Sequence, residues 1–443
     1  MCVGYFLVLL DVTIVNVALP SIGAGLHAQV STLQWVVDAY ALALASLMLP
    51  AGTVGDRFGH RRVVLAGLAV FGAGSLACGL AGNAGVLTAA RAVQGVGAAM
   101  LLPGTLAIIS DAFPDRQARA RAIGVWAGIG SLALPAGPLL GGALIDGVGW
   151  RAVFLVNVPV VLAAGVATVF VVQPGRPRRD LAVDGAGAAL GVLLLVAATF
   201  AVIDAGRSGG YSVPALVAAV VAVAAVVAFR SVERRRGDAA MLPPDLMRRP
   251  RFAIANTAAG VMNLGSLGTL FVLTLFLQSV QHRSPLGAGL ALVPLFAPLA
   301  VIAPFAGRLT GRIGPRMPAV AGLVLAAAGL ALLAWARPGS SYPLVLLPAF
   351  LAWGVGLGVL TPALVAAAVS AVPERRSGLA SAVNNTARQA GGAIGIAVAG
   401  AVAGQPGDAR FLTGLHAVAL GAAVLYLLTA VVVASASSAT RQL

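Results

Sequence analysis

The sequence predicts an all-α polytopic membrane protein with fourteen transmembrane helices. Hydrophobic residues make up 59% of its 443 residues and charged residues only 10%, which excludes an ordinary soluble domain. Apolar segments follow one another along the chain, and most have close to the ~20 residues that cross a bilayer as a helix. All basic residues are arginine, and most lie in the short loops between these segments, as the topology of a multi-pass protein requires.

Each predicted span is a long stretch with few or no charges. Glycine and proline occur inside many of them, which transmembrane helices tolerate because neighbouring helices satisfy the freed backbone groups. The predicted spans are residues 3–22, 36–54, 64–81, 85–109, 122–145, 153–172, 185–203, 213–229, 252–280, 288–307, 319–336, 344–369, 379–403 and 412–434.

The arginines orient these spans, because loops alternate between the two sides of the membrane. One side is arginine-rich and includes Arg57, Arg176, Arg178, Arg179, Arg234, Arg312, Arg375 and Arg441. The other side holds Arg151, Arg207, Arg283, Arg337 and Arg410. Arginine-rich loops stay in the cytoplasm, so we expect a multi-pass protein of the cell inner (cytoplasmic) membrane with both termini cytoplasmic. The net charge of +15 then reflects topology, and we expect no nucleic-acid partner.

An internal repeat predicts the domain organisation. Residues 307–316 repeat the glycine- and arginine-rich loop at residues 52–61, with Gly311 at the position of Asp56. Two copies of one loop indicate two related halves. We therefore expect six-helix bundles at 1–172 and 252–443, separated by a linker, 173–251, that contains two additional transmembrane helices.

Several motifs resemble those of one family. Residues 52–62 are similar to the signature loop between helices 2 and 3 of the major facilitator superfamily. Four further stretches resemble motifs of its fourteen-helix drug:proton antiporter branch, in the order that the branch shows: residues 10–20, 87–97, 134–142 and 150–159, followed by residues 384–392 in the second half. The resemblance implies the major facilitator fold, with two six-helix bundles and two extra helices between them.

The resemblance also implies a function. It is the proton-coupled efflux of amphipathic, cationic or aromatic drugs or antibiotics by alternating access, in a monomer embedded in the lipid bilayer. The partners would be the small-molecule substrate and protons, with no cofactor beyond the proton gradient. We expect no enzymatic activity, because no catalytic set or phosphate-binding loop is evident and the chain has no lysine. The two cysteines, Cys2 and Cys78, indicate neither a disulfide nor a metal site.

Charged residues inside the apolar segments are the candidate proton-coupling groups: Asp11, Asp38 and Arg91. Asp11 lies about halfway along the first span, where an ionisable group is costly and therefore functional by default. Burial favours the protonated carboxyl and a nearby cation favours the ionised one, which is the competition that proton exchange requires. Asp38, near the outer end of its span, is either a coupling group or an exposed helix-terminal charge. Arg91 requires a partner, either Asp11 or Asp38.

Two further groups of residues are predicted to control conformation. A cytoplasmic latch would consist of Gly52, Asp56, Arg57, Gly59, Arg61 and Asp111, with Asp111 bridging Arg61. A bend or close helix contact in the fifth span would use Pro135, Gly137, Pro138, Gly141 and Gly142, because small residues let helices approach closely. Topology and ordinary helix packing select the same residue types, so these structural explanations remain open.

Aromatic and polar residues of the spans are candidates for the substrate cavity, because a drug site is mostly apolar with a few polar anchors. They are Asn16, Gln94, Trp126, Met262, Asn263, Phe271, Phe276, Gln278, Trp353, Asn384, Asn385 and Arg388. The aromatic members are equally compatible with lipid-facing positions. Two alternative functions stay open: export of one dedicated metabolite or lipid, and a membrane sensor or structural protein that transports nothing.

Overall fold

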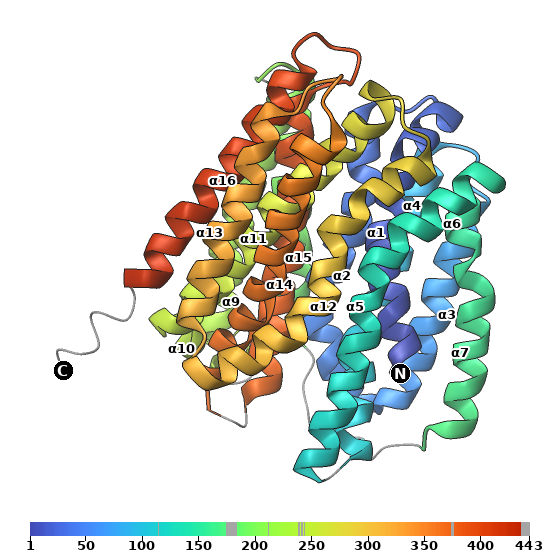
Figure 1. Cartoon of the computed structure of the whole chain (residues 1–443). Coiled ribbons are helices and arrows are strands. Elements are labelled where there is room, and N and C mark those ends of the chain that lie inside the picture. Colours follow the sequence, from blue (N-terminus) through green and yellow to red (C-terminus); the bar gives the residue numbers. More distant parts are fainter. Residues whose placement is uncertain are drawn as a thin grey trace. The chain divides into compact units, whose positions relative to one another are not determined.

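The computed structural model describes residues 1–113, 115–173, 184–210, 212–237, 240, 242, 244–373 and 376–435. Throughout these ranges the regular structure is helical, without a strand (Figure 1). The predicted loop arginines Arg176, Arg178, Arg179, Arg375 and Arg441 lie outside the described residues.

The helices belong to two compact units. The first comprises Met1–Ala197, Val221–Met241 and Ser284–Gly289, and the second comprises Ala198–Val220, Leu242–Arg283 and Leu290–Leu443. Both units therefore take part of the segment between the predicted bundles, and the predicted domain boundaries stay predictions.

Seven helices of the first unit are consecutive in the chain. α4 packs along α2 and α3, and α1 packs along α5. At the α3–α4 contact, a Cβ added to Gly97 would lie only 2.4 Å from the backbone nitrogen of Phe71. The main chains touch there, as small residues permit in membrane helix pairs. These helices are α1 (Cys2–Leu26), α2 (Val30–Phe58), α3 (His60–Gly79), α4 (Ala84–Ala112), α5 (Arg116–Gly147), α6 (Ala152–Leu155) and α7 (Asn157–Val171).

The second unit is built around the pair α11 and α15. A Cβ on Gly391 of α15 would lie 2.1 Å from the carbonyl oxygen of Gly260 on α11, so the two backbones are in contact. α13 packs against α14 and α16. The helices are α10 (Pro244–Met247), α11 (Pro250–Leu275), continued by a π-helical turn (Phe276–Val280), most of α12 (Pro285–Ile313), α13 (Arg316–Leu332), α14 (Leu347–Ser370), α15 (Ser377–Ala403) and α16 (Phe411–Ser435).

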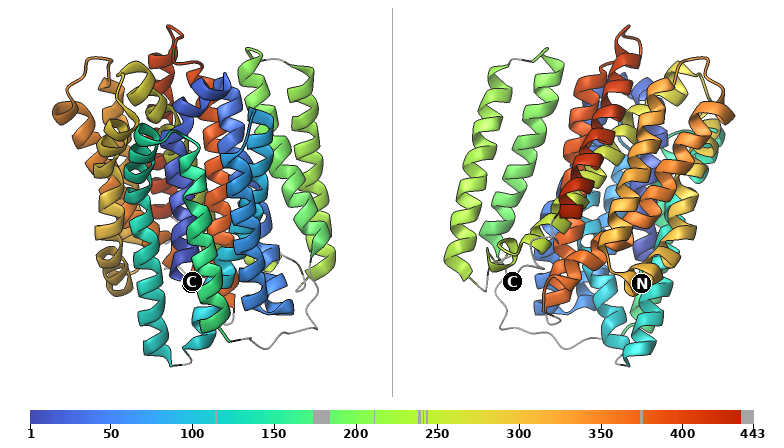
Figure 2. Two further views of the ribbon diagram at one scale, coloured as in Figure 1. Left: turned by 90° about the vertical axis from the view of Figure 1, so that its right-hand side faces the viewer. Right: turned by 60° about the vertical axis from the view of Figure 1, so that its left-hand side comes forward.

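α8 (Gly185–Arg207) and α9 (Val213–Arg236) are the two green helices of Figure 2, and both units take part of each. Only 17% of the most apolar stretch of α9 is buried. Its outward side chains include Val220, Val223 and Val227, each more than half exposed. In a membrane protein such a face is covered by lipid.

Thirteen helices among the described residues are long and apolar enough to cross a membrane. They cover thirteen of the fourteen predicted spans. The remaining one, predicted at 379–403, is the 27-residue helix α15, whose polar residues Asn384, Asn385, Arg388 and Gln389 lower its hydropathy. Because α15 packs along α11, these side chains do not all have to meet lipid.

Candidate functional site

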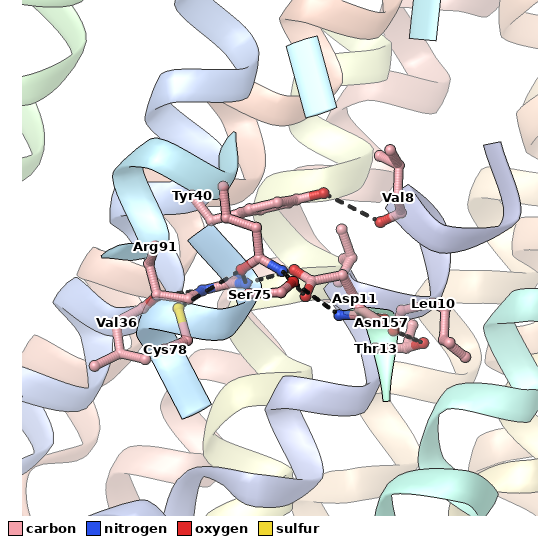
Figure 3. A network of polar contacts seen from close by, with 12 residues as sticks. Val8, Leu10, Asp11, Thr13, Val36, Tyr40, Ser75, Cys78, Arg91 and Asn157 are labelled. Carbon is pink, nitrogen blue, oxygen red and sulfur yellow. Dashed lines mark hydrogen bonds and ion pairs between the residues drawn. The ribbon is translucent and has the colours of Figure 1, made fainter. Parts of the chain in front are cut away.

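A buried ion pair lies inside the first unit. A terminal nitrogen (Nη1) of Arg91 on α4 is 2.5 Å from Oδ2 of Asp11 on α1, and both side chains are at most 1% exposed. Gln94, one helical turn after Arg91, completes a triangle. Its amide donates to Asp11 Oδ1 at 2.7 Å, and its carbonyl oxygen accepts from Arg91 Nη1 at 2.6 Å. Both oxygens of the buried carboxylate are thereby satisfied (Figure 3).

A second layer of polar groups holds this triangle. Gln94 also donates to the Ser75 hydroxyl on α3 at 2.7 Å, and Asn157 at the start of α7 donates to the same oxygen at 3.3 Å. The Arg91 guanidinium lies 4.3 Å from the ring centre of Tyr40 and its Nε donates to the Val36 carbonyl at 3.1 Å. Five helices of the unit thus meet at one network, which fixes the position of each charged group.

The sequence explains why these side chains converge. Arg91 and Gln94 are three residues apart on α4 and so lie on one face of the helix. Gly95 and Gly97 bring that part of α4 against α2 and α3, since a Cβ at Gly95 would lie 2.5 Å from the Tyr40 carbonyl oxygen. The close helix contacts are consistent with the burial of the pair.

Asp38 on α2 is also fully buried, and neither carboxylate oxygen has a hydrogen-bond partner in the described part of the chain. The interpretation of Asp38 as an exposed helix-terminal charge is therefore wrong. Arg91 pairs with Asp11 and forms no ion pair with Asp38. An ionised carboxylate without a partner is costly to bury, and protonation removes most of that cost.

The proline- and glycine-rich part of α5 packs against α1. A Cβ on Gly137 would overlap Thr13, and one on Gly141 would lie 2.8 Å from Ile14. Gly142 faces Leu286, at the start of α12 and within the first unit. Close helix contact, expected for Pro135, Gly137, Pro138, Gly141 and Gly142, is thus present at the three glycines, whereas any role in transport stays a prediction.

The predicted latch residues are only partly brought together. Asp56 pairs with His60 at 3.0 Å, and Arg61 donates to the Val169 carbonyl at 2.8 Å. Asp111 is exposed, and no ion pair joins it to Arg61 in the described structure. Gly59 has a φ of 94° between α2 and α3, a conformation that favours glycine. Gly52 approaches Pro103 of α4, and Arg57 lies against the ring of Phe58.

The predicted cavity residues are divided between the two units, and most of them are buried. Gln94 belongs to the buried network, and Asn16, Met262, Phe271, Phe276, Trp353 and Asn384 are also buried. Trp126 stacks on Tyr5 at 3.8 Å between ring centres, and the Asn384 amide donates to Asn256 at 3.2 Å. Asn263, Gln278, Asn385 and Arg388 are half-buried. Two crevices of about 920 and 570 Å³ involve none of these residues.

Sequence reasoning missed the supporting role of Ser75, Tyr40 and Asn157. Asn157 lies within the motif at residues 150–159, and Tyr40 lies two residues after Asp38. Ser75 offered one signal, since it is an isolated polar residue in the otherwise apolar predicted span 64–81. The sequence could not show which of the other helices it faces.

The comparisons with known proteins decide the family. The model of the Major Facilitator Superfamily matches residues 1–396 and 257–441. The chain belongs to the Major Facilitator Superfamily. The predicted all-α multi-pass fold and the predicted family are confirmed. A solved structure aligns with this chain at a TM-score of 0.71 and 16% identity, over 100% of this chain and 99% of its own. It comes from work on substrate recognition in proton-dependent oligopeptide transporters. That likeness concerns the fold alone.

Several relatives are named for drug resistance or export. The multidrug resistance protein Stp of Mycobacterium tuberculosis is 38% identical over 90% of this chain and 74% of its own length. The methylenomycin A resistance protein of Streptomyces coelicolor is 34% identical, over 95% and 88%. The tetracenomycin C resistance and export protein of Streptomyces glaucescens is 34% identical, over 92% and 75%. Family and relatives are those of a transporter rather than an enzyme.

The buried pair makes a prediction about stability. Arg91→Gln leaves the Asp11 carboxylate buried without its cation and should lower the free energy of unfolding by about 3–5 kcal/mol. Combining it with Asp11→Asn should recover most of that loss, because no uncompensated charge remains. Unfolding of purified protein in detergent, followed for both single variants and the double variant, measures the coupling. Arg337→Gln, at an exposed arginine, is the control. The pair would be contradicted if the changes in the free energy of unfolding caused by Arg91→Gln and Asp11→Asn summed to within about 0.5 kcal/mol of the change in the double variant.

Proposed function

We propose that this chain exports amphipathic, cationic or aromatic drugs or antibiotics in exchange for protons, by alternating access. The observation that carries the proposal is the buried Asp11–Arg91–Gln94 network, in a chain whose relatives are named for drug resistance and export. The proton gradient supplies the energy, and no cofactor takes part. The arginine distribution supports a cytoplasmic membrane location with both termini in the cytoplasm, and we propose a functional monomer.

Asp11 is the proposed carrier of the exchanged proton. Protonation of its carboxyl removes the charge that holds the Arg91 guanidinium, so the contact at 2.5 Å loses its ionic part. Network members from α1, α3, α4 and α7 then gain freedom to rearrange. A cationic substrate that approaches the site favours the ionised carboxylate again. Proton and substrate therefore compete for one charge, which is the requirement for exchange.

Asp38 is the proposed second titrating group. It is buried without a hydrogen-bond partner among the described residues, so this conformation favours its neutral form. A conformation that admits water or a cation to α2 would favour the ionised form. The ionisation of Asp38 thus depends on whether water or a cation reaches α2, whereas the ionisation of Asp11 depends on its contact with Arg91.

The first functional prediction distinguishes the role of Asp11 from that of Asp38. In proteoliposomes with an imposed pH gradient, Asp11→Asn should abolish drug accumulation against a gradient, because the site then mimics the protonated state permanently. Asp38→Asn should lower drug-driven proton release while drug binding persists. Asp408→Asn, in an exposed turn, is the control and should behave as wild type. Full proton-driven accumulation in both Asp11→Asn and Asp38→Asn would refute coupling through these groups.

The second functional prediction concerns the cytoplasmic latch at the loop between α2 and α3. We propose that Asp56, Arg61 and Asp111 bias the open and closed populations without contacting substrate. Arg61→Ala removes the guanidinium that binds the Val169 carbonyl, and Asp56→Asn weakens the pair with His60. Both variants should keep normal amounts of folded protein but show several-fold slower dye efflux. Arg62→Ala, at the exposed neighbouring arginine, should leave efflux unchanged. Equal efflux in all three variants would remove the latch from the mechanism.

A second candidate function is the export of one dedicated compound. The relatives named for methylenomycin A and tetracenomycin C each carry a single antibiotic in their name. A transporter of broad specificity should protect a susceptible host against several unrelated cations and aromatic antibiotics, and a dedicated one against a single compound. Resistance profiling of the wild type beside Asp11→Asn distinguishes them. A profile identical for both proteins on every compound would favour the sensor or structural alternative.

A further inference from the structure

A crevice of about 920 Å³ opens between α8, α9 and α15, within the second unit. Its walls include Ala205 of α8, Leu216 and Ala219 of α9, and Val398 and Val402 of α15. α8 touches α15 closely at one point, where a Cβ on Gly206 would lie 2.3 Å from Cβ of Ala401. The crevice surrounds this contact, because the small side chains on both helices leave the remaining space unfilled.

The crevice is apolar and open to its surroundings. Leu216 is 67% exposed and Val402 is 47% exposed. α8 and α9 are both long and apolar enough to cross a membrane. What reaches such a crevice is therefore the hydrocarbon of the bilayer, present at a far higher concentration than any transported compound. Its volume lies in the range of sites that enclose a ligand of drug or lipid size.

One arginine stands at the crevice without an anionic partner. Arg410 lines it and forms no ion pair with any residue that the structure describes. Of the two nearby carboxylates, Asp204 pairs with Arg207 at 2.9 Å and binds the Ser212 hydroxyl, and Asp408 accepts from the Gln405 backbone at 3.0 Å. The crevice therefore combines apolar walls with one available guanidinium.

We propose that this crevice binds one phospholipid with an anionic headgroup. An acyl chain lies between α8, α9 and α15, and the headgroup phosphate accepts from Arg410. A guanidinium matches phosphate oxygens in a two-pronged geometry. A zwitterionic headgroup is disfavoured because it brings a second cation, its ammonium, close to the Arg410 guanidinium. The lipid fills the space that the helices leave, and so stabilises α8 and α9 against α15. This site is separate from the proposed export site.

The test measures lipid retention by native mass spectrometry of the purified full chain. Phosphatidylglycerol and phosphatidylcholine with identical acyl chains are added in separate titrations. Wild type should retain one phosphatidylglycerol at concentrations where phosphatidylcholine is lost. Arg410→Gln should weaken phosphatidylglycerol retention on the order of tenfold, because the glutamine amide can replace only one of the two hydrogen bonds and carries no charge. Arg337→Gln, at an exposed arginine outside the crevice, should match wild type.

A second pair of variants tests the acyl chain. Ala219→Phe fills the crevice from an exposed position and should weaken retention of both lipids. Val220→Phe, the adjacent exposed position of α9 that does not line the crevice, should change neither. Equal retention of the two lipids by wild type, or equal retention by Arg410→Gln and Arg337→Gln, overturns the headgroup assignment. Unchanged retention in Ala219→Phe overturns the site. Displacement of phosphatidylglycerol by a transported dye, with ethidium as the probe, would reassign the crevice to substrate.

Discussion

The ion pair between Asp11 and Arg91 is the constraint on which the first unit depends. A guanidinium buried among apolar helices is tolerated only when a partner and further hydrogen bonds compensate for its lost hydration. Here Asp11 supplies the charge, and Gln94, the Val36 carbonyl and the Tyr40 ring supply the remaining contacts. Because these groups come from three helices, the pair and its hydrogen bonds connect α1, α2 and α4 at one point.

The composition of the network also determines which group is able to change charge. Arginine stays protonated in proteins, and Gln94, Ser75 and Asn157 are uncharged. Asp11 is therefore the acidic group at the centre whose ionisation alters the charge of the whole cluster. A site that combines one permanent cation with one carboxyl is neutral when the carboxyl is ionised and positive when it is protonated. These two charge states follow from the composition of the cluster alone.

Much of this structure follows from the sequence, because bilayer thickness and helical rise together set the span length. The predicted spans correspond to helices throughout, and α15 stands apart only because Asn384, Asn385 and Arg388 lower its hydropathy. The pairing of Arg91 followed from the cost of an isolated buried cation, although the sequence left Asp11 and Asp38 equally eligible. Close contact of the fifth span was predictable from its small residues, but the identity of the contacting helix was not. The shared Ser75 hydroxyl, the burial of Asp38 and the Val169 partner of Arg61 all depend on which faces meet, and one-dimensional periodicity does not encode that.

The contact of Gly260 with Gly391 joins α11 and α15 of the second unit at their backbones. Where two helices meet through side chains, a change of rotamer lets one slide past the other. α11 and α15 meet there through their main chains, which have no rotamers to exchange. A side chain larger than hydrogen at Gly391 would therefore have to separate the two helices. Arg388 lies on α15 one turn before Gly391, so the same glycine contact sets how far its backbone lies from α11.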